Sequence, residues 1–198
     1  MAPGPEHEEA PLSVVQEAIW YTSRLHPRRL TYNETIPIRK RGSLDAEVLE
    51  RALRELVRRH ESLRTNLRVV DGRPVQVVGE VPDLELPAVD LSHLDPAEAE
   101  AAALARVAEV DGAPYDLRRG ALVRPLLFRF PEEHRLYLGI HHVAFDGVSL
   151  ARVLMPELIA LYAAFAEGRP SPLSDPPVRY VDYARWEQEW IASPKAER

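Results

Sequence analysis

The residues best suited to chemistry in this 198-residue chain lie in one run, IHHVAFDGVS, at residues 140–149. Histidine titrates near neutral pH, so either histidine of the run could accept or donate a proton in a reaction. The run follows an apolar, strand-like segment at residues 136–140 and precedes a long apolar periodic segment at residues 148–165. It therefore predicts a strand, a turn and a helix, with the histidines at a junction held by rigid elements on both sides.

His141 and His142 are expected to have different roles, because successive side chains on a strand point to opposite faces. One of them is available for chemistry and the other is structural. Adjacent strand histidines are also poor joint ligands for a metal, and the chain contains no cysteine. We therefore expect no zinc site, no disulfide and no thiolate nucleophile.

Asp146 and Ser149 suggest catalytic roles, but each has a simpler interpretation. Asp146 lies just before the predicted helix, where it can act as the N-cap and accept a hydrogen bond from the amide of Val148 or Ser149. We favour this role over membership of a catalytic triad. Ser149 has no histidine-and-acid set assigned to it, so it is better interpreted as a first-turn helix serine. Gly147 either keeps the helix start open to a backbone amide or a substrate, or only satisfies the turn.

The elements expected to position this run alternate between helices and strands. Hydrophobic periodicity predicts helices at residues 13–25, 45–60, 95–110, 148–168 and 180–191, and strands at residues 32–41, 63–70, 74–78, 86–89, 122–130 and 134–141. The turn pair Asp71-Gly72 predicts a hairpin. The arginines of the helix at 45–60 are expected on its solvated face, and the proline-rich residues 169–178 are expected to form an extended linker. The fold class is therefore α/β, with helices on a mixed or antiparallel sheet.

Composition limits the environment and the partners. The 45% hydrophobic and 28% charged fractions are typical of a soluble globular protein. Residues 1–10, rich in proline and glutamate, are expected to be a disordered leader without a secretory signal, and no apolar run is expected to span a membrane. A cytoplasmic protein that binds no membrane follows. The net charge of −6, without a basic patch carrying aromatics, makes nucleic acid an unexpected partner.

Four segments, in order, resemble the condensation domains of nonribosomal peptide synthetases. They are residues 12–20 (LSVVQEAIW), 59–65 (RHESLRT), 141–147 (HHVAFDG) and 180–186 (YVDYARW). The third, His-His-x-x-x-Asp-Gly, is a weak signal when isolated and a strong one when the other three flank it. The resemblance implies two chloramphenicol-acetyltransferase-like lobes in a V with this motif at the seam. Residues 11–198 would then be the N-terminal lobe, and the C-terminal lobe is absent from the sequence.

The resemblance also implies a reaction and a set of site residues. A condensation domain joins an acyl or peptidyl thioester on phosphopantetheine to the amine of a second carrier-bound aminoacyl thioester. It binds no cofactor of its own; donor and acceptor carrier proteins are its partners. By resemblance His142 is the general base or positioning residue, because the amine must lose a proton. His141, Asp146 and Gly147 are motif or structural support, and Arg64 is the candidate partner of Asp146.

Two other functions remain open at this stage. The chain could be a non-catalytic module that binds a carrier protein or a separate second lobe, in which case an exposed apolar surface is expected on the side of the missing lobe. It could also be another acyltransferase with the same histidine motif. A single lobe leaves one wall of a seam active site in water, so we expect little turnover from this chain alone.

Overall fold

The computed structural model describes residues 9–27, 29–119 and 122–194, and its strands form two sheets. The first sheet has the order β1-β4-β3 and contains β1 (Glu9–Pro11), β3 (Thr65–Val70) and β4 (Arg73–Val78). The second has the order β2-β7-β6-β5 and contains β2 (Asn33–Arg41), β5 (Ala88–Asp90), β6 (Val123–Arg129) and β7 (Glu133–His141). Only β5 runs parallel to its neighbour, β6, so this sheet is mixed. This confirms the expected α/β class.

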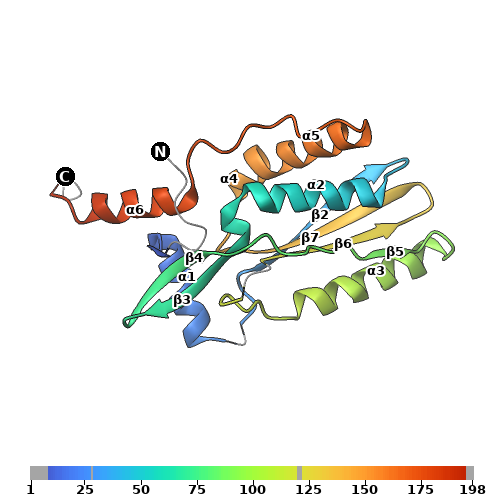
Figure 1. The fold of residues 1–198 in the computed structure, drawn as a ribbon. Coiled ribbons are helices and arrows are strands. Elements are labelled where there is room, and N and C mark those ends of the chain that lie inside the picture. The colour runs from blue at the N-terminus through green and yellow to red at the C-terminus, as the bar shows by residue number, and fades with distance from the viewer. Residues whose placement is uncertain (1–8, 28, 120–121, 195–198) are drawn as a thin grey trace.

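Helices cover both faces of the four-stranded sheet (Figure 1). The helix α2 (Ala46–Arg59) lies beside α5 (Met155–Ala166) on one face, and α3 (Pro96–Asp111) lies on the other. The main core fills the space between the sheet and the α2/α5 layer, and a smaller core lies under α3. Because both faces are covered, β6 is apolar at inward positions on either side, with Leu127 in the main core and Phe128 in the smaller one.

The hairpin and the capped helices follow the sequence signals closely. Asp71 and Gly72 have φ values of 50° and 77°, the left-handed conformation that a tight two-residue hairpin turn requires. The helix α1 (Val14–Leu25) begins with a capping box between Ser13 and Gln16, and Asp45 caps α2. The last helix, α6 (Tyr180–Ile191), packs on α1 and β1 after the extended residues 169–178. The ends of these elements lie within two residues of the predicted ends.

Two expectations about the ends and surfaces of the fold need correction. Residues 9 and 10 of the expected leader belong to β1, where Ala10 is buried and pairs with Gln76. Residues 1–8 of that leader lie outside the described part of the chain. The helical stretch Gly147–Ala166 is, by length and composition alone, apolar enough to cross a membrane, which was not expected. In the fold, one side of this stretch packs into the main core, as the buried core helix of a soluble protein also would.

That stretch is not one regular α-helix. It consists of the short α4 (Gly147–Ser149), a π-helical turn at Leu150–Leu154 and then α5. Pro156, in the first turn of α5, has no backbone N–H to donate to the preceding turn, which accounts for a change of helical pitch at this point. The helix that follows the histidine motif therefore starts as a separate short turn whose N-cap is Asp146.

Candidate functional site

The histidine motif lies where β7 ends and α4 begins, beside the first residues of β2. The backbone N–H of His142 donates to the carbonyl oxygen of Tyr32 at 2.8 Å, and that of His141 donates to Leu122 at 3.1 Å. These two bonds tie the end of β7 to both of its neighbours. The backbone that carries both imidazoles is therefore held by the sheet, as a precise site requires.

His141 is packed inside the protein. Only 5% of its surface is exposed, its Nδ1 accepts a hydrogen bond from the N–H of Val143 at 3.2 Å, and its ring meets Tyr115 edge-on at 5.5 Å. Burial, reinforced by the nearby charges of His142 and Arg124, lowers the pKa of His141 to about 4. The ring is therefore neutral at pH 7, which suits a structural residue.

This depressed pKa predicts that the protein becomes less stable in mild acid. The unfolded chain protonates His141 near its ordinary pKa of 6.5 and the folded chain near 4, so stability is full above pH 6.5 and falls between pH 6.5 and 4. We expect His141 to account for a loss of at most about 3 kcal/mol in the free energy of unfolding over that range. Urea unfolding at a series of pH values measures it.

The matched variants isolate this contribution. His141→Asn retains an acceptor for the amide of Val143 and should flatten the dependence of unfolding free energy on pH. His93→Asn, at an exposed position, should leave that dependence unchanged. An equal slope in wild type and His141→Asn would mean that His141 does not titrate as its burial requires.

His142 faces the other side of β7 and remains accessible. Its side chain is 32% exposed, its ring stacks on Phe145 at 5.1 Å between centroids, and its Nε2 lies 3.0 Å from Oε1 of Glu34. The two histidines therefore differ as the strand alternation predicts, one buried and one open. The choice of His142 as the reacting or positioning histidine remains a prediction.

Asp146 caps the helix that follows the motif, as predicted. Its Oδ1 accepts from the N–H of Ser149 at 2.7 Å, and the Ser149 hydroxyl in turn accepts from the N–H of Asp146 at 2.9 Å. The bonds from Ser149 lower the pKa of Asp146. A side chain added at Gly147 would meet no atom within 4 Å, so packing within the chain does not require glycine there. The space beside Gly147 is open, as the approach of another backbone or a substrate would need.

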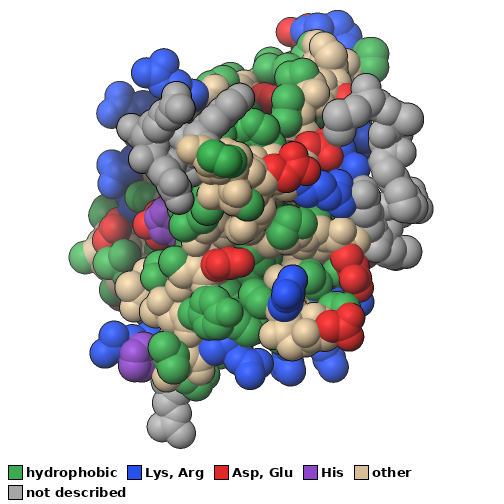
Figure 2. Space-filling view, turned by 90° about the vertical axis from the view of Figure 1, so that its left-hand side faces the viewer, with side chains coloured by type: hydrophobic (Ala, Val, Ile, Leu, Met, Phe, Trp, Pro, Cys, Tyr) green, Lys and Arg blue, Asp and Glu red, His purple; other side chains and the backbone are tan. Residues whose placement is uncertain are grey.

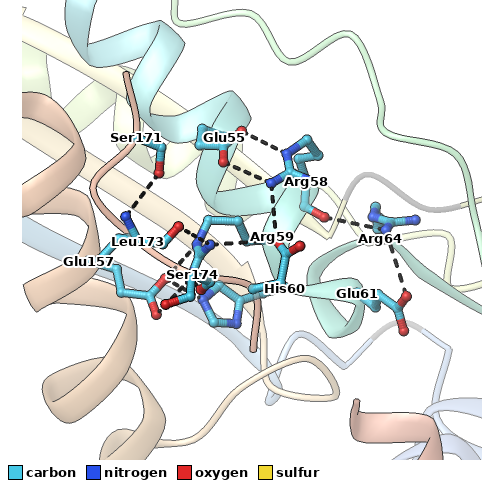
Figure 3. A network of polar contacts seen from close by, with 11 residues as sticks. Glu55, Arg58, Arg59, His60, Glu61, Arg64, Glu157, Ser171, Leu173 and Ser174 are labelled. Atoms are coloured by element: carbon cyan, nitrogen blue, oxygen red, sulfur yellow. Dashed lines mark hydrogen bonds and ion pairs between the residues drawn. The ribbon is translucent and has the colours of Figure 1, made fainter. Parts of the chain in front are cut away.

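Arg64, the expected partner of Asp146, has other contacts. Its guanidinium donates to the carbonyl oxygen of Gly79. It also donates to the carbonyl oxygen of Arg58 and lies 4.0 Å from Glu61 (Figure 3). The carboxylate of Asp146 is used by Ser149. The predicted Arg64–Asp146 pair is therefore absent from the described contacts, because a local helix cap satisfies the aspartate and the arginine braces the chain between η1 (Glu61–Arg64) and β4.

The buried arginine of this region is its neighbour in the motif, Arg59. Its side chain is 2% exposed and bonds to the Glu157 carboxylate at 3.1 Å and to the carbonyl oxygen of Ser174 at 2.8 Å (Figure 3). Nε2 of His60 lies 2.8 Å from the same carboxylate. Burial opposes ionisation of Glu157, but the bonds from Arg59 and His60 lower its pKa overall. The expectation that all arginines of α2 are solvated is therefore wrong for Arg59, which joins α2 to α5 and to the extended segment.

A cavity of about 260 Å³ adjoins the opposite side of the motif. His141 forms part of its wall, together with Trp20 from α1, Tyr115 and several arginines. His142 is not among its lining residues. Within the described residues, no group of three or more His, Asp or Glu side chains is placed to hold a metal ion. The imidazole of the open histidine can take part in proton transfer, hydrogen bonding and electrostatic stabilisation.

The geometry of the motif agrees with the resemblance seen in the sequence, and a match to a family model decides which family the chain belongs to. The model described as "Condensation domain" matches residues 6–198. The chain belongs to the condensation-domain family. The expected lobe fold, a chloramphenicol-acetyltransferase-like sheet flanked by helices, is confirmed with it.

Relatives of this condensation-domain chain are peptide synthetases. Chondramide synthase of Chondromyces crocatus is 40% identical over 197 residues, which are 99% of this chain and 5% of that protein. One of the linear gramicidin synthase proteins of Brevibacillus parabrevis is 38% identical over 192 residues, 96% of this chain and 2% of that protein. The first condensation domain of the calcium-dependent antibiotic synthetase, solved with a substrate analogue, has a TM-score of 0.85 at 28% identity.

The chain spans part of each of these proteins. The structural match covers 96% of its own length and 47% of the solved antibiotic-synthetase domain, so the chain matches about half of a condensation domain. Whatever the other half of such a domain contributes to the site has no counterpart among these 198 residues.

Proposed function

We propose that the chain is the N-terminal lobe of a condensation domain that forms amide bonds in nonribosomal peptide biosynthesis. The donor is an acyl or peptidyl thioester and the acceptor an aminoacyl thioester, each brought by the phosphopantetheine arm of a carrier protein in the cytoplasm. The observation that carries the proposal is the open imidazole of His142 at the end of β7, in a chain whose family match covers residues 6–198.

His142 is suited to the proton transfer that amide formation demands. The acceptor amine must lose a proton as it attacks the thioester, and histidine is the side chain that most often accepts such a proton in enzymes. The accessible ring next to open space at Gly147 leaves room for reactants. In this proposal His142 is the general base or the positioning residue, with His141, Asp146 and Gly147 as support around it. Arg64 instead supports the fold between η1 and the end of β4.

A second lobe is part of the proposal, because the chain matches about half of a solved condensation domain. Large apolar side chains stand exposed on and beside α6, and they are Val178, Tyr183, Trp186, Trp190 and Ile191. Figure 2 looks onto the side where α6 lies in Figure 1 and shows hydrophobic side chains gathered there. Such a surface suits burial against another protein surface rather than water. The same surface favours the alternative function, a binding module without catalysis.

A condensation assay separates these functions. Two loaded carrier proteins are incubated with the 198-residue chain alone, and again with the second lobe supplied as a separate polypeptide or in an intact parent domain. We expect amide product only when the second lobe is present, because a half-open site lacks the positioning and dry surroundings that accelerate acyl transfer. Product from the chain alone would point to a self-sufficient site. No product in either arm would support the binding module.

A further inference from the structure

The cavity of about 260 Å³ beside the motif has no part in the proposed function. Its wall is built from distant segments, which are α1, the start of β2, β3, residues 114–118 and the end of β7. His141 lines this cavity and His142 does not. A protein cavity of about 150 Å³ can hold benzene, so this one has room for a benzene-sized body with a polar group attached.

The buried histidine of the motif offers a hydrogen-bond donor to this cavity. Nδ1 of His141 accepts from the backbone N–H of Val143 at 3.2 Å, and the ring is neutral at pH 7 because burial lowers its pKa to about 4. A neutral imidazole carries one proton, which is therefore on Nε2. No hydrogen bond from the described residues reaches Nε2, and Nε2 is not one of their fully buried atoms without a partner. The Nε2–H group is therefore accessible from the cavity.

A second neutral donor lies beside the first. The ring of Tyr115 meets that of His141 edge-on, with 5.5 Å between the centroids, and it also lines the cavity. Burial raises the pKa of Tyr115 to about 12, so its hydroxyl keeps the proton at pH 7. Among the described contacts no hydrogen bond involves this hydroxyl, and its oxygen is not fully buried. Two donors from different segments therefore lie side by side at one cavity.

Arg124 on β6 holds Tyr115 in this place. Its guanidinium lies 3.8 Å from the centroid of the Tyr115 ring. The same guanidinium donates to the carbonyl oxygens of Ala113 at 2.6 Å and Pro114 at 2.8 Å. A side chain added at Gly139 would come within 3.2 Å of the Tyr115 hydroxyl oxygen, so glycine leaves space for that hydroxyl. Bracing of this kind is what a precise binding site requires.

The charge around the cavity is mainly positive. Four exposed arginines line it, against one acid, and they are Arg24, Arg29, Arg68 and Arg118. The acid, Asp116, pairs with Arg118 at 3.1 Å. Within the described part of the chain no ion pair involves Arg29 or Arg68. Because the whole chain carries a net charge of −6, this local excess of positive charge departs from the average and favours an anion.

We propose that this cavity binds a small organic anion, whose carboxylate or phosphate oxygens accept hydrogen bonds from Nε2–H of His141 and from the hydroxyl of Tyr115. The walls at Trp20 and Val69 contact the apolar body of the ligand, and the exposed arginines neutralise its charge. His141 then has a binding role in addition to its structural one. This site is separate from amide formation at His142, so it is tested by binding alone, whatever the outcome of the condensation assay.

Calorimetric titration of the 198-residue chain at pH 7 tests the proposal. The probes are phenyl phosphate and benzoate, together with benzyl alcohol, which has the ring without the charge, and inorganic phosphate, which has the charge without the ring. We expect the tighter of the two ring anions to bind with a Kd of about 1 mM or below and about tenfold more tightly than benzyl alcohol or inorganic phosphate. The tighter one identifies the anionic group that the site prefers.

Two results of this titration would overturn the proposal. If neither ring anion binds, the cavity is only a gap in packing. If inorganic phosphate binds as tightly as phenyl phosphate and benzoate, the exposed arginines hold any anion and the cavity contributes nothing.

Substitution of the hydroxyl donor is the sharpest test of the geometry. Tyr115→Phe removes one oxygen atom and should weaken binding of the ring anion about tenfold, the usual effect of losing a hydrogen bond to a charged group. The matched control is Tyr162→Phe on α5, whose hydroxyl accepts from the backbone N–H of Asp45 and which should leave the Kd unchanged. Equal affinity of Tyr115→Phe and wild type would contradict the proposed contact.

The charge of the exposed arginines is tested separately. Combined Arg29→Gln and Arg68→Gln should weaken binding about threefold or more, since both side chains are exposed and their charges are screened. Arg106→Gln, at a 51% exposed arginine of α3, removes the same kind of charge elsewhere and should have no effect. Equal losses in the two proteins would mean that only the net charge of the chain matters.

The contact of His141 is read without substituting it. In nitrogen-15 spectra of the 198-residue chain, the Nε2 signal of His141 should move as the ring anion is added and stay still with benzyl alcohol. The ring signals of exposed His93 should not move with either probe. An unmoved Nε2 signal at saturating ring anion would show that the ligand does not contact His141 and would overturn the proposal.

Discussion

Replacing His142 with alanine in a complete condensation domain is expected to lower kcat by a factor of about 10² to 10⁴, the usual contribution of a positioned acid–base group. The imidazole is the open one of the pair, since His142 is 32% exposed and His141 is buried. Removing it leaves the acceptor amine without a nearby proton acceptor on this wall of the site. Single-turnover measurements of amide product with both carriers loaded would separate this chemical step from carrier binding.

The control for this experiment is His134→Ala, at the other end of the same strand. His134 lies near the start of β7, at the far end of the strand from the motif, and its ring bonds to the carbonyl oxygen of Gly42. Loss of the His134 side chain should leave the rate unchanged. His142→Ala should unfold at nearly the same temperature as wild type, because the side chain is partly solvated. Turnover of His142→Ala within about threefold of wild type would remove the catalytic assignment and favour the binding module.

Local signals in the sequence predicted most of the fold and the division of roles at the motif. Asp71-Gly72 specifies its hairpin because few residue pairs tolerate two positive φ values. Asp146 was identified as an N-cap from its place before an apolar helix, and its bonds to Ser149 confirm that role. The alternation of a strand was enough to predict one buried and one open histidine. These are all properties of residues within a few positions of one another.

The parts of the site that the sequence did not reveal depend on contacts between distant segments. Glu34 meets His142 only because β2 pairs with β7 in one register, and a shift of one residue would turn Glu34 to the other face. The register cannot be read from either strand alone. Arg64 was assigned to Asp146 because a buried aspartate needs a partner, but the helix cap supplies that partner locally.

Arg59 is a different case, because a local signal was present. It lies seven residues after Ala52 and three after Leu56, both buried on the core face of α2, so helical periodicity places it on that face as well. Its charge led to the opposite interpretation. A charged residue on an apolar stripe predicts a buried partner elsewhere in the chain, and here the partner is Glu157, 98 residues away.

Arg59→Ala is expected to lower the free energy of unfolding by about 3 to 5 kcal/mol, since it leaves the Glu157 carboxylate partly buried without its main counter-charge. It also removes the donor that bonds the carbonyl oxygen of Ser174 at 2.8 Å. Arg58→Ala is the matched control on the same helix. Its side chain is 49% exposed and pairs with Glu55, so the expected loss is at most about 1 kcal/mol. Denaturant unfolding of the three proteins at pH 7 provides the comparison.

A double variant then tests whether the loss comes from the unpaired charge. Glu157→Gln and Arg59→Met should each destabilise the protein alone, but together they remove both charges and keep an apolar side chain in the arginine's place. We expect the double variant to lose less unfolding free energy than the two single variants lose together, because replacing both partners avoids a lone buried charge. Additive losses would mean that Arg59 acts through the bonds of its guanidinium to the carbonyl oxygens of Leu173 and Ser174, and not through Glu157. Non-additive losses would identify the Arg59–Glu157 ion pair as the anchor that holds α2 against α5 on the face of the sheet that carries His142.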